Sequence, residues 1–308
     1  MPATLTSPIM KPVARHLASD LDLSIEGLKE VLALAGRMKG TPSRFTRTLQ
    51  GRYLTLLFEK PSLRTRFTFE LAIKQLGGDS ITHTGLIGER EPVKDIARNL
   101  DRWTQGIVAR VFSHNTIDEL AHWSAVPVIN ALSDLYHPCQ ALADALTLQE
   151  KLGRLQGRKI AYVGDGNNVA HSLMLTCTRL GMEVAIAAPA GYAPSPQIVE
   201  QASHFGKVEV TEDAKVALKN ADAVYTDVWA SMGQEAEQDE RKRVFAPFQV
   251  NRDLFGAANP QAIFMHCLPA KRGQEVTDEV MELEHSVVFD QAENRLHVQK
   301  ALLAFLLS

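Results

Sequence analysis

A short segment rich in hydroxyl and guanidinium groups, Ser62-Leu63-Arg64-Thr65-Arg66, has the chemistry of an anion site. Apolar residues recur at helical spacing from Phe67 to Leu76 and the pattern ends at Gly77-Gly78, so we expect a helix with Ser62 as its N-cap. The first turn of such a helix presents unpaired N–H groups, and Arg64 and Arg66, with Thr65 between them, can bind one phosphate in a fixed geometry. The segment predicts a site for a phosphate-sized anion; the alternative is a solvated basic helix start.

Other polar side chains follow the remaining predicted strands. In parallel α/β sheets, ligands bind beyond the carboxyl ends of the strands. We therefore expect six strand ends, drawn from two domains, to face one cleft. The residues concerned are Ser62, Arg110, Asp134, His137-Pro138-Cys139-Gln140, Asn167 with Asn168, Asp227 with Ser231-Met232-Gly233, and His266-Cys267-Leu268-Pro269.

Several of these residues also have a purely structural interpretation, which the sequence leaves open. A histidine before a helix, as at His137, often only bonds the backbone. A lone cysteine such as Cys267 is usually a small buried hydrophobic group. Asp227 is either an ordinary loop carboxylate or a partner for a substrate ammonium, and Arg295 is either a surface arginine or a contact that returns to the cleft.

The elements that must position these residues alternate between short β-rich runs and helical patterns, which is typical of parallel sheets with crossover helices. We predict an α/β fold of two domains, each a parallel sheet flanked by helices, the second doubly wound and Rossmann-like. Predicted strands are 53–58, 80–84, 107–112, 126–131, 159–163, 183–188, 208–210, 223–227 and 262–267, with a last short strand near Val287. Predicted helices are 24–38, 64–76, 93–103, 117–124, 138–152 and one ending at Leu180.

The first domain is predicted to span residues 1–150 and the second residues 151–289, with residues 153–159 as the linker. An amphipathic helix, 294–307, is expected to pack back onto the first domain as part of a C-terminal segment, 290–308. The charged stretch 234–243 is expected to be a solvated surface segment or loop. Because the turn Gly164-Asp165-Gly166-Asn167-Asn168 lacks the third glycine of a dinucleotide fingerprint, a nicotinamide cofactor is disfavoured.

Composition narrows the possible partners. The 308 residues are 45% hydrophobic and 22% charged, as in ordinary globular proteins. A net charge of -3 argues against a nucleic-acid partner. No apolar run approaches the roughly 18–20 residues that cross a bilayer, and no secretion signal is seen, so we expect a cytoplasmic protein without a membrane partner. Three scattered cysteines, Cys139, Cys177 and Cys267, indicate neither a disulfide framework nor a zinc site.

Taken together, these motifs resemble those of the ornithine carbamoyltransferase family over essentially the whole chain. Residues 62–66 resemble its carbamoyl-phosphate motif, residues 137–140 its second motif, Asp227 with residues 231–233 its amino-acid loop, and residues 266–269 its closing motif. The aspartate-using sister enzymes share the first two motifs but not the last two. Alternatives left open are a carbamoyltransferase for putrescine, N-acetylornithine or aspartate, and a catalytically silent sensor or assembly subunit with this fold.

The resemblance implies a homotrimer with active sites at subunit interfaces, no cofactor and no metal. It implies that Arg110, His137, Asp227 and Cys267 take part in catalysis and that Asn168, Asp227, Ser231 and Met232 bind ornithine. Closure of the segment 231–243 over ornithine is a hypothesis from the same pattern. The implied carbamoyl-phosphate residues are Ser62, Leu63, Arg64, Thr65, Arg110, His137, Pro138, Cys139, Gln140, Cys267, Leu268 and Arg295.

The chain departs from the family pattern at one position. Relatives often carry glutamine or histidine two residues before Gly88, and that residue is thought to reach a neighbouring subunit's carbamoyl phosphate. This chain has Leu86 there, and His83 is a possible replacement.

Overall fold

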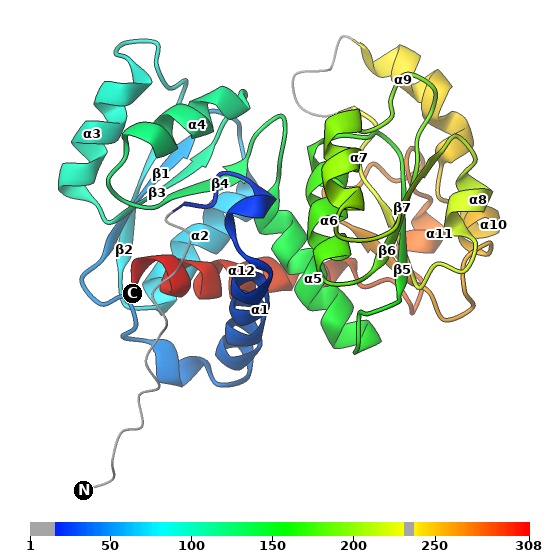
Figure 1. Cartoon of the computed structure of the whole chain (residues 1–308), viewed down its shortest axis with the longest axis horizontal. Coiled ribbons are helices and arrows are strands. Elements are labelled where there is room, and N and C mark those ends of the chain that lie inside the picture. Colours follow the sequence, from blue (N-terminus) through cyan, green and yellow to red (C-terminus); the bar gives the residue numbers. More distant parts are fainter. Residues whose placement is uncertain (1–15, 231–236) are drawn as a thin grey trace, which may run out of the picture.

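The computed structural model describes residues 16–230 and 237–308. Two parallel sheets lie side by side, each flanked by helices, and the long helix α5 (Pro138–Leu152) lies between them (Figure 1). The predicted fold class is confirmed. Among the described residues, no helix is both long and apolar enough to cross a membrane.

The first sheet has four parallel strands in the order β2-β1-β3-β4. Strand β1 alternates its side chains between two cores, as the two-residue period of a strand requires. Leu54, Leu56 and Phe58 pack on one face, and Leu57 packs on the other. The elements are η1 (Asp20–Asp22), α1 (Ile25–Gly40), η2 (Pro42–Phe45), β1 (Tyr53–Phe58), α2 (Leu63–Gln75), β2 (Asp79–Thr84), α3 (Val93–Trp103), β3 (Gly106–Arg110), α4 (His114–Trp123) and β4 (Val128–Leu132).

The second sheet has five parallel strands in the order β7-β6-β5-β8-β9. From the central strand β5 the chain winds outward to β7, then returns to build β8 and β9 on the opposite side, which makes the sheet doubly wound. The elements are β5 (Lys159–Val163), α6 (Asn168–Arg179), β6 (Glu183–Ala187), α7 (Pro196–Ser203), β7 (Val208–Thr211), α8 (Ala214–Leu218), β8 (Ala223–Thr226), α9 (Gln238–Phe245), η4 (Ala246–Phe248), α10 (Arg252–Phe255), β9 (Ile263–His266) and α11 (Asp278–Met281).

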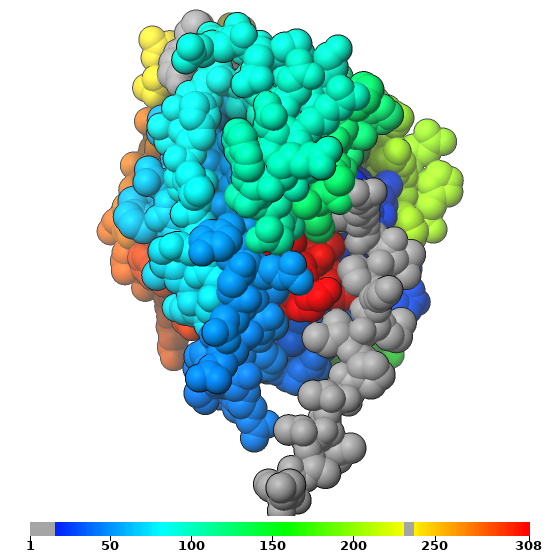
Figure 2. Space-filling model, turned by 90° about the vertical axis from the view of Figure 1, so that its left-hand side faces the viewer, coloured from blue at the N-terminus to red at the C-terminus, as the bar shows by residue number. Residues whose placement is uncertain are grey.

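The C-terminal helix α12 (Val288–Leu307) returns to the first sheet and packs against α1, α2 and α5. We predicted an amphipathic helix beginning near Asn294, but α12 begins six residues earlier and is buried on several sides. Its last ten residues, from Val298 to Leu307, are all buried. Figure 2 shows only a small area of its red surface between neighbouring elements. The helix therefore forms part of the core around the first sheet.

Other local predictions need correction. The strand expected near Val287 is only an isolated bridge between Phe264 and Ser286, because α12 begins immediately afterwards. The strand predicted to reach Phe112 ends at Arg110. Residues 238–243 of the charged stretch lie at the surface, as expected, but they belong to α9 rather than to a loop, and Arg241 is buried. The division into domains of residues 1–150 and 151–289 stays a prediction.

Candidate active site

A cavity of about 700 Å³ lies where the two sheets meet. Its walls come from the segments that follow β1, β3, β4, β5, β8 and β9, so the six predicted strand ends do meet at one cavity. In each sheet, adjacent strands that wind in opposite directions, β1 with β3 and β5 with β8, place their ends here. The predicted residues that line it are Ser62, Leu63, Arg64, Thr65, Arg110, Asp134, His137, Gln140, Asn167, Asn168, Asp227, Cys267, Leu268, Pro269 and Arg295.

Six of the residues expected to face the cleft are not among those lining residues, and one of them is His266, which is buried. Pro138 and Cys139 lie in the first turn of α5 and are buried. The Cys139 thiol donates to the Asn130 carbonyl at 3.4 Å, inside the first unit. Ser231 and Met232 lie outside the described residues, as does Gly233.

The wall from the first sheet is built on the start of α2. Ser62 is the N-cap by position, but its hydroxyl makes no bond to the first turn. The hydroxyl and the first N–H groups of α2 are therefore available to an anion. Arg64 lines the cavity, whereas Arg66 pairs with Glu70 at 2.8 Å and lines a separate pocket of about 330 Å³. The expectation that both arginines bind one anion is corrected, because residues two positions apart on a helix point to different sides.

Three buried side chains of this wall retain polar atoms without partners. Within residues 16–230 and 237–308, Arg110 Nε, His137 Nδ1 and Arg295 Nε make no hydrogen bond. Buried polar atoms are normally paired, so these atoms indicate that a ligand completes the site. Arg295 also donates to Thr65 Oγ1 at 2.8 Å, which joins α12 to the start of α2.

The charge states of these groups follow from their burial. Burial, and next the Arg295 charge, lower the pKa of Arg110 to about 10, so the guanidinium stays protonated at neutral pH. Burial, with the charges of Arg295 and Arg110, holds the pKa of His137 well below 6.5, so its imidazole is neutral. The wall can therefore bind an anion through fixed cations and donate one further hydrogen bond from a neutral ring.

The wall from the second sheet centres on the carboxylate of Asp227. Its Oδ1 accepts from the Cys267 thiol at 3.0 Å and from the Val228 N–H at 2.8 Å. Its Oδ2 accepts from Asn167 Nδ2 at 3.0 Å. Burial, followed by the charge of Asp227 and the bond to it, raises the pKa of the Cys267 thiol well above its usual value, so the thiol is neutral.

The two asparagines of this wall have different surroundings. Asn167 caps α6, because its Oδ1 accepts from the backbone N–H groups of Val169 and Ala170. The Asn167 amide nitrogen is thereby turned toward Asp227. Asn168 donates to the Ser133 carbonyl at 2.6 Å, across to the first unit.

Three side chains could be considered as metal ligands, because their ligand atoms lie within 4.8 Å of one another: Asp227, His266 and Cys267. The His266 ring does not fit that role. Its Nδ1 accepts from the Leu268 N–H at 2.9 Å, which leaves the proton on Nε2, and Nε2 lies 3.2 Å from Glu275 Oε1. Both ring nitrogens are thus engaged in holding the turn after β9.

Several lining residues were not singled out from the sequence. The Lys60 ammonium lies 4.5 Å from the centroid of the Phe112 ring. Because Lys60 is two residues before Ser62, its position next to the motif could have identified it as a lining residue. Lys271 follows the 266–269 motif in the same way. Gln238, at the start of α9, lies in the segment 231–243 that was expected to close over ornithine, but it was not named individually.

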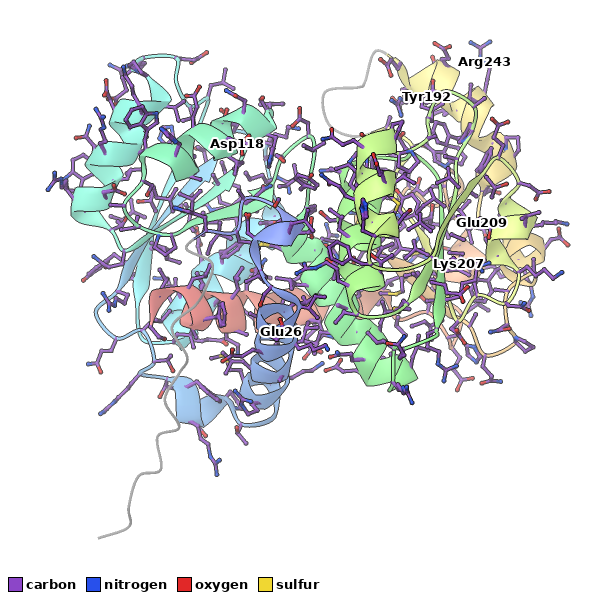
Figure 3. All side chains as sticks on the ribbon, viewed as in Figure 1. Glu26, Asp118, Tyr192, Lys207, Glu209 and Arg243 are labelled. Atoms are coloured by element: carbon purple, nitrogen blue, oxygen red, sulfur yellow. The ribbon has the colours of Figure 1, made fainter. Side chains whose placement is uncertain are left out.

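Helix α9 is anchored to the second sheet by Arg241. This side chain binds Asp165 and the Trp229 carbonyl, each at 2.9 Å, and its guanidinium carbon lies 4.8 Å from the Tyr192 ring centroid. Figure 3 shows Tyr192 beside α9, with Arg243 of the same helix pointing outward.

A cationic wall that faces a carboxylate-bearing wall suits a protein that brings an anion together with an amine. The chain belongs to the aspartate/ornithine carbamoyltransferase family: residues 15–150 match its carbamoyl-phosphate-binding domain and residues 156–306 its aspartate/ornithine-binding domain.

Individual relatives are similar over nearly their whole length. The ornithine carbamoyltransferase of Thermococcus kodakarensis is 51% identical over 299 residues, which covers 93% of this chain and 94% of the relative. The anabolic ornithine carbamoyltransferase of Pyrococcus furiosus is 47% identical, covering 97% and 98%. A solved structure of ornithine carbamoyltransferase from Pyrococcus furiosus superposes with a TM-score of 0.92 at 48% identity, covering 96% of this chain and 98% of that one.

Proposed function

We propose that this enzyme transfers the carbamoyl group of carbamoyl phosphate to the side-chain amine of L-ornithine, giving L-citrulline and phosphate. One observation carries the proposal. Arg110, Arg295 and His137, with their unpartnered buried nitrogen atoms, line the same cavity as the Asp227–Cys267 pair. The relatives named above carry the same activity in their names.

The anion half of the cavity suits carbamoyl phosphate. Its phosphate would take the Ser62 and Thr65 hydroxyls, the Arg64 and Arg110 guanidiniums and the N–H groups at the start of α2. The carbamoyl oxygen gains negative charge as the amine attacks, and donors fixed in advance stabilise that charge. Arg64, Thr65, Arg110 and His137 supply these donors, while Gln140 and the Leu268 carbonyl accept from the carbamoyl NH₂.

The amine half suits a zwitterionic diamine. The ornithine carboxylate would bind the Asn168 amide, whose second N–H is not used by Ser133. The α-ammonium would bind Asp227, whose position is fixed by Asn167 and Cys267. Ser231 and Met232 are assigned to the same substrate by family resemblance.

The reaction needs no covalent intermediate with the enzyme. The free δ-amine of ornithine forms the new C–N bond, the bond from the carbamoyl carbon to the phosphate oxygen breaks, and phosphate leaves with the electron pair. Departing phosphate takes the proton that the amine loses. Because its thiol is neutral, Cys267 contributes with Asp227 as a hydrogen-bonding group beside the amine, and rate comes mainly from orientation and fixed charge.

We further propose a cytoplasmic homotrimer that works in arginine biosynthesis, with active sites at its subunit interfaces. An exposed apolar stripe supports the assembly: Leu63, Phe67 and Leu71 lie on one face of α2, one turn apart. Isolated exposed apolar residues are ordinary, but a stripe beside a functional cavity marks an interaction surface. Leu63 also lines the cavity, so a subunit bound on this stripe would lie next to the substrate.

A two-substrate assay tests the activity. We expect citrulline from ornithine and carbamoyl phosphate, and little carbamoylation of putrescine, N-acetylornithine or aspartate. The Arg64→Ala variant should keep its circular dichroism spectrum but lose carbamoyl-phosphate binding. A preference for another amine would overturn the substrate assignment, and no turnover at all would favour a silent sensor on the same fold.

A further inference from the structure

A buried carboxylate, Asp144, lies behind the cavity without lining it. It is on α5, one turn beyond Gln140, and is fully buried. Its Oδ1 accepts from Gln140 Nε2 at 2.8 Å and from Gln291 Nε2 at 2.7 Å. Its Oδ2 has no partner among the residues that the structure describes. The proposed reaction gives this ionisable group no role, although burying a carboxyl group is costly.

The carboxylate and Arg295 together determine which end of the Gln140 amide faces the cavity. An ionised carboxylate only accepts hydrogen bonds, so the amide nitrogen must face Asp144. The amide oxygen then faces the opposite side, where it accepts from Arg295 Nη1 at 2.5 Å. Both Gln140 and Arg295 line the cavity, so Gln140 presents an acceptor there.

The same carboxylate orients a second amide. Gln291, one turn before Arg295 on α12, directs its nitrogen to Asp144, and its oxygen accepts from the backbone N–H of His266 at 3.0 Å. His266 precedes Cys267 at the end of β9. One charge thus holds together α5, α12 and the last strand of the second sheet.

We propose that Asp144 is a positioning residue that makes the site select a carbamoyl NH₂ over a carboxylate at the end of the phosphorylated ligand. This inference rests on the proposed function, because it specifies how that cavity recognises its anion. Two effects act in the same direction. The Gln140 oxygen accepts from an NH₂ group but repels a carboxylate, and the charge of Asp144 offsets that of Arg295, which would otherwise attract a carboxylate.

The ionisation of Asp144 is consistent with this role. Burial raises its pKa to about 7, while bonds from Gln140 and Gln291, the Arg295 charge and the Tyr225 hydroxyl act in the opposite direction. At pH 8 the carboxylate is therefore mostly ionised, and the test is made at that pH.

The test compares two stable analogues by titration calorimetry: phosphonoacetamide, which ends in an amide, and phosphonoacetate, which ends in a carboxylate. The measured quantity is the ratio of their dissociation constants, acetate over amide. We expect Asp144→Leu, which removes the acceptor, to lower this ratio by about tenfold or more. Asp144→Asn keeps one acceptor oxygen but loses the charge, so we expect a fall of about threefold. Thr147→Val, a buried polar change one turn further along α5, should leave the ratio unchanged.

An unchanged ratio in folded Asp144→Leu, or equal weakening of both analogues, would overturn the proposal. If Asp144→Leu does not fold, an unchanged ratio in Asp144→Asn overturns it. Citrulline formation by the wild type distinguishes a failure of this inference from a failure of the proposed reaction. If the wild type makes citrulline but the ratio does not respond to the substitutions, only the inference fails. If it makes none while the ratio falls as described, the reaction fails and the role of Asp144 stands.

Discussion

Asp227 is the residue on which the amine half of the cavity depends. Each of its oxygens is held by a neighbour from a different part of the second unit, Asn167 on one side and Cys267 on the other. A carboxylate held in this way has its charge directed at a fixed point, which is what recognition of an ammonium requires. Neither neighbour carries a compensating positive charge.

We expect Asp227→Asn to lower kcat/KM for ornithine by roughly a hundredfold or more, because truncating a buried charge pair typically costs about 2–5 kcal/mol. The KM for carbamoyl phosphate should change less than about threefold, since all the groups assigned to its phosphate come from the other wall. Steady-state kinetics with each substrate varied in turn measures both effects. Asp134→Asn is a control, because Asp134 lines the same cavity but accepts from the His114 backbone. Equal losses for both substrates would contradict the assignment.

Asp144 also makes a prediction about stability. Burial raises its pKa from 3.8 to about 7 in the folded protein, so between about pH 4 and pH 7 the folded state holds a proton that the unfolded state has released. The free energy of unfolding therefore falls as pH rises through this window. Asp144→Asn lacks this contribution, so we expect the stability of the wild type relative to the variant to fall between pH 4 and pH 7.

Urea unfolding of both proteins at several pH values measures this difference. Asp20, whose pKa burial raises to about 6, contributes with the same sign in both proteins and cancels. As a control, Asp239→Asn changes a side chain that is 98% exposed, and its free energy of unfolding should vary with pH in parallel with that of the wild type. Parallel curves for Asp144→Asn as well would refute the raised pKa.

At the scale of elements, the start of α6 joins local stability to the site. The Asn167 side chain closes the first turn of α6 with its oxygen and orients Asp227 with its nitrogen. A cap ordinarily stabilises only its own helix. Here the same amide serves the fold and the substrate, because the helix begins directly after β5 and beside β8.

Removing this cap should therefore have two effects. We expect Asn167→Ala to destabilise the protein by about 1 kcal/mol through loss of the cap, and to raise the KM for ornithine by about tenfold through loss of the bond to Asp227. Asp213→Ala removes a comparable cap, from α8, and should cost similar stability without changing the KM. Thermal melts and ornithine kinetics on both variants make the comparison, and an unchanged KM in Asn167→Ala would contradict the positioning role.

At the scale of the whole molecule, α12 closes the core of the first sheet and carries Arg295 into the cavity. On the outside of the same unit, α2 begins at the anion site and presents the stripe of Leu63, Phe67 and Leu71. The proposed trimer would cover this stripe, which would couple assembly to the active site.

We expect Phe67→Glu to dissociate the assembly, because a charge replaces an apolar side chain that is 53% exposed in the isolated chain and covered in the proposed trimer. Light scattering after size-exclusion chromatography measures the mass. Phe289→Glu is a matched control: Phe289 is 66% exposed on α12, outside the stripe, and its variant should keep the wild-type mass. A trimer that persists in Phe67→Glu would place the interface elsewhere.

Local sequence determined much of this molecule. The alternation of strands and helices predicted two parallel sheets, since periodicity is a local property, and the motifs at the strand ends predicted which segments share the cavity. Periodicity did not predict the correct secondary structure near Val287 or in α9. Near Val287, a short run of β-forming residues makes only an isolated bridge, because a strand also needs a paired neighbour. In α9, the charged run is held against the second sheet by the ion pair between Arg241 and Asp165.

The direction of individual side chains was decided only in the tertiary structure. The sequence could not show that Arg64 lines the cavity while Arg66 pairs with Glu70, or that the Asn167 amide nitrogen points to Asp227. Both depend on which neighbours each side chain contacts. The sequence did not indicate a role for Asp144, because that role depends on its hydrogen bond with Gln291, which is 147 residues away. Hydrogen bonds have direction and join distant segments, so the chain specifies which chemical groups are present, and packing decides which of them face the ligand.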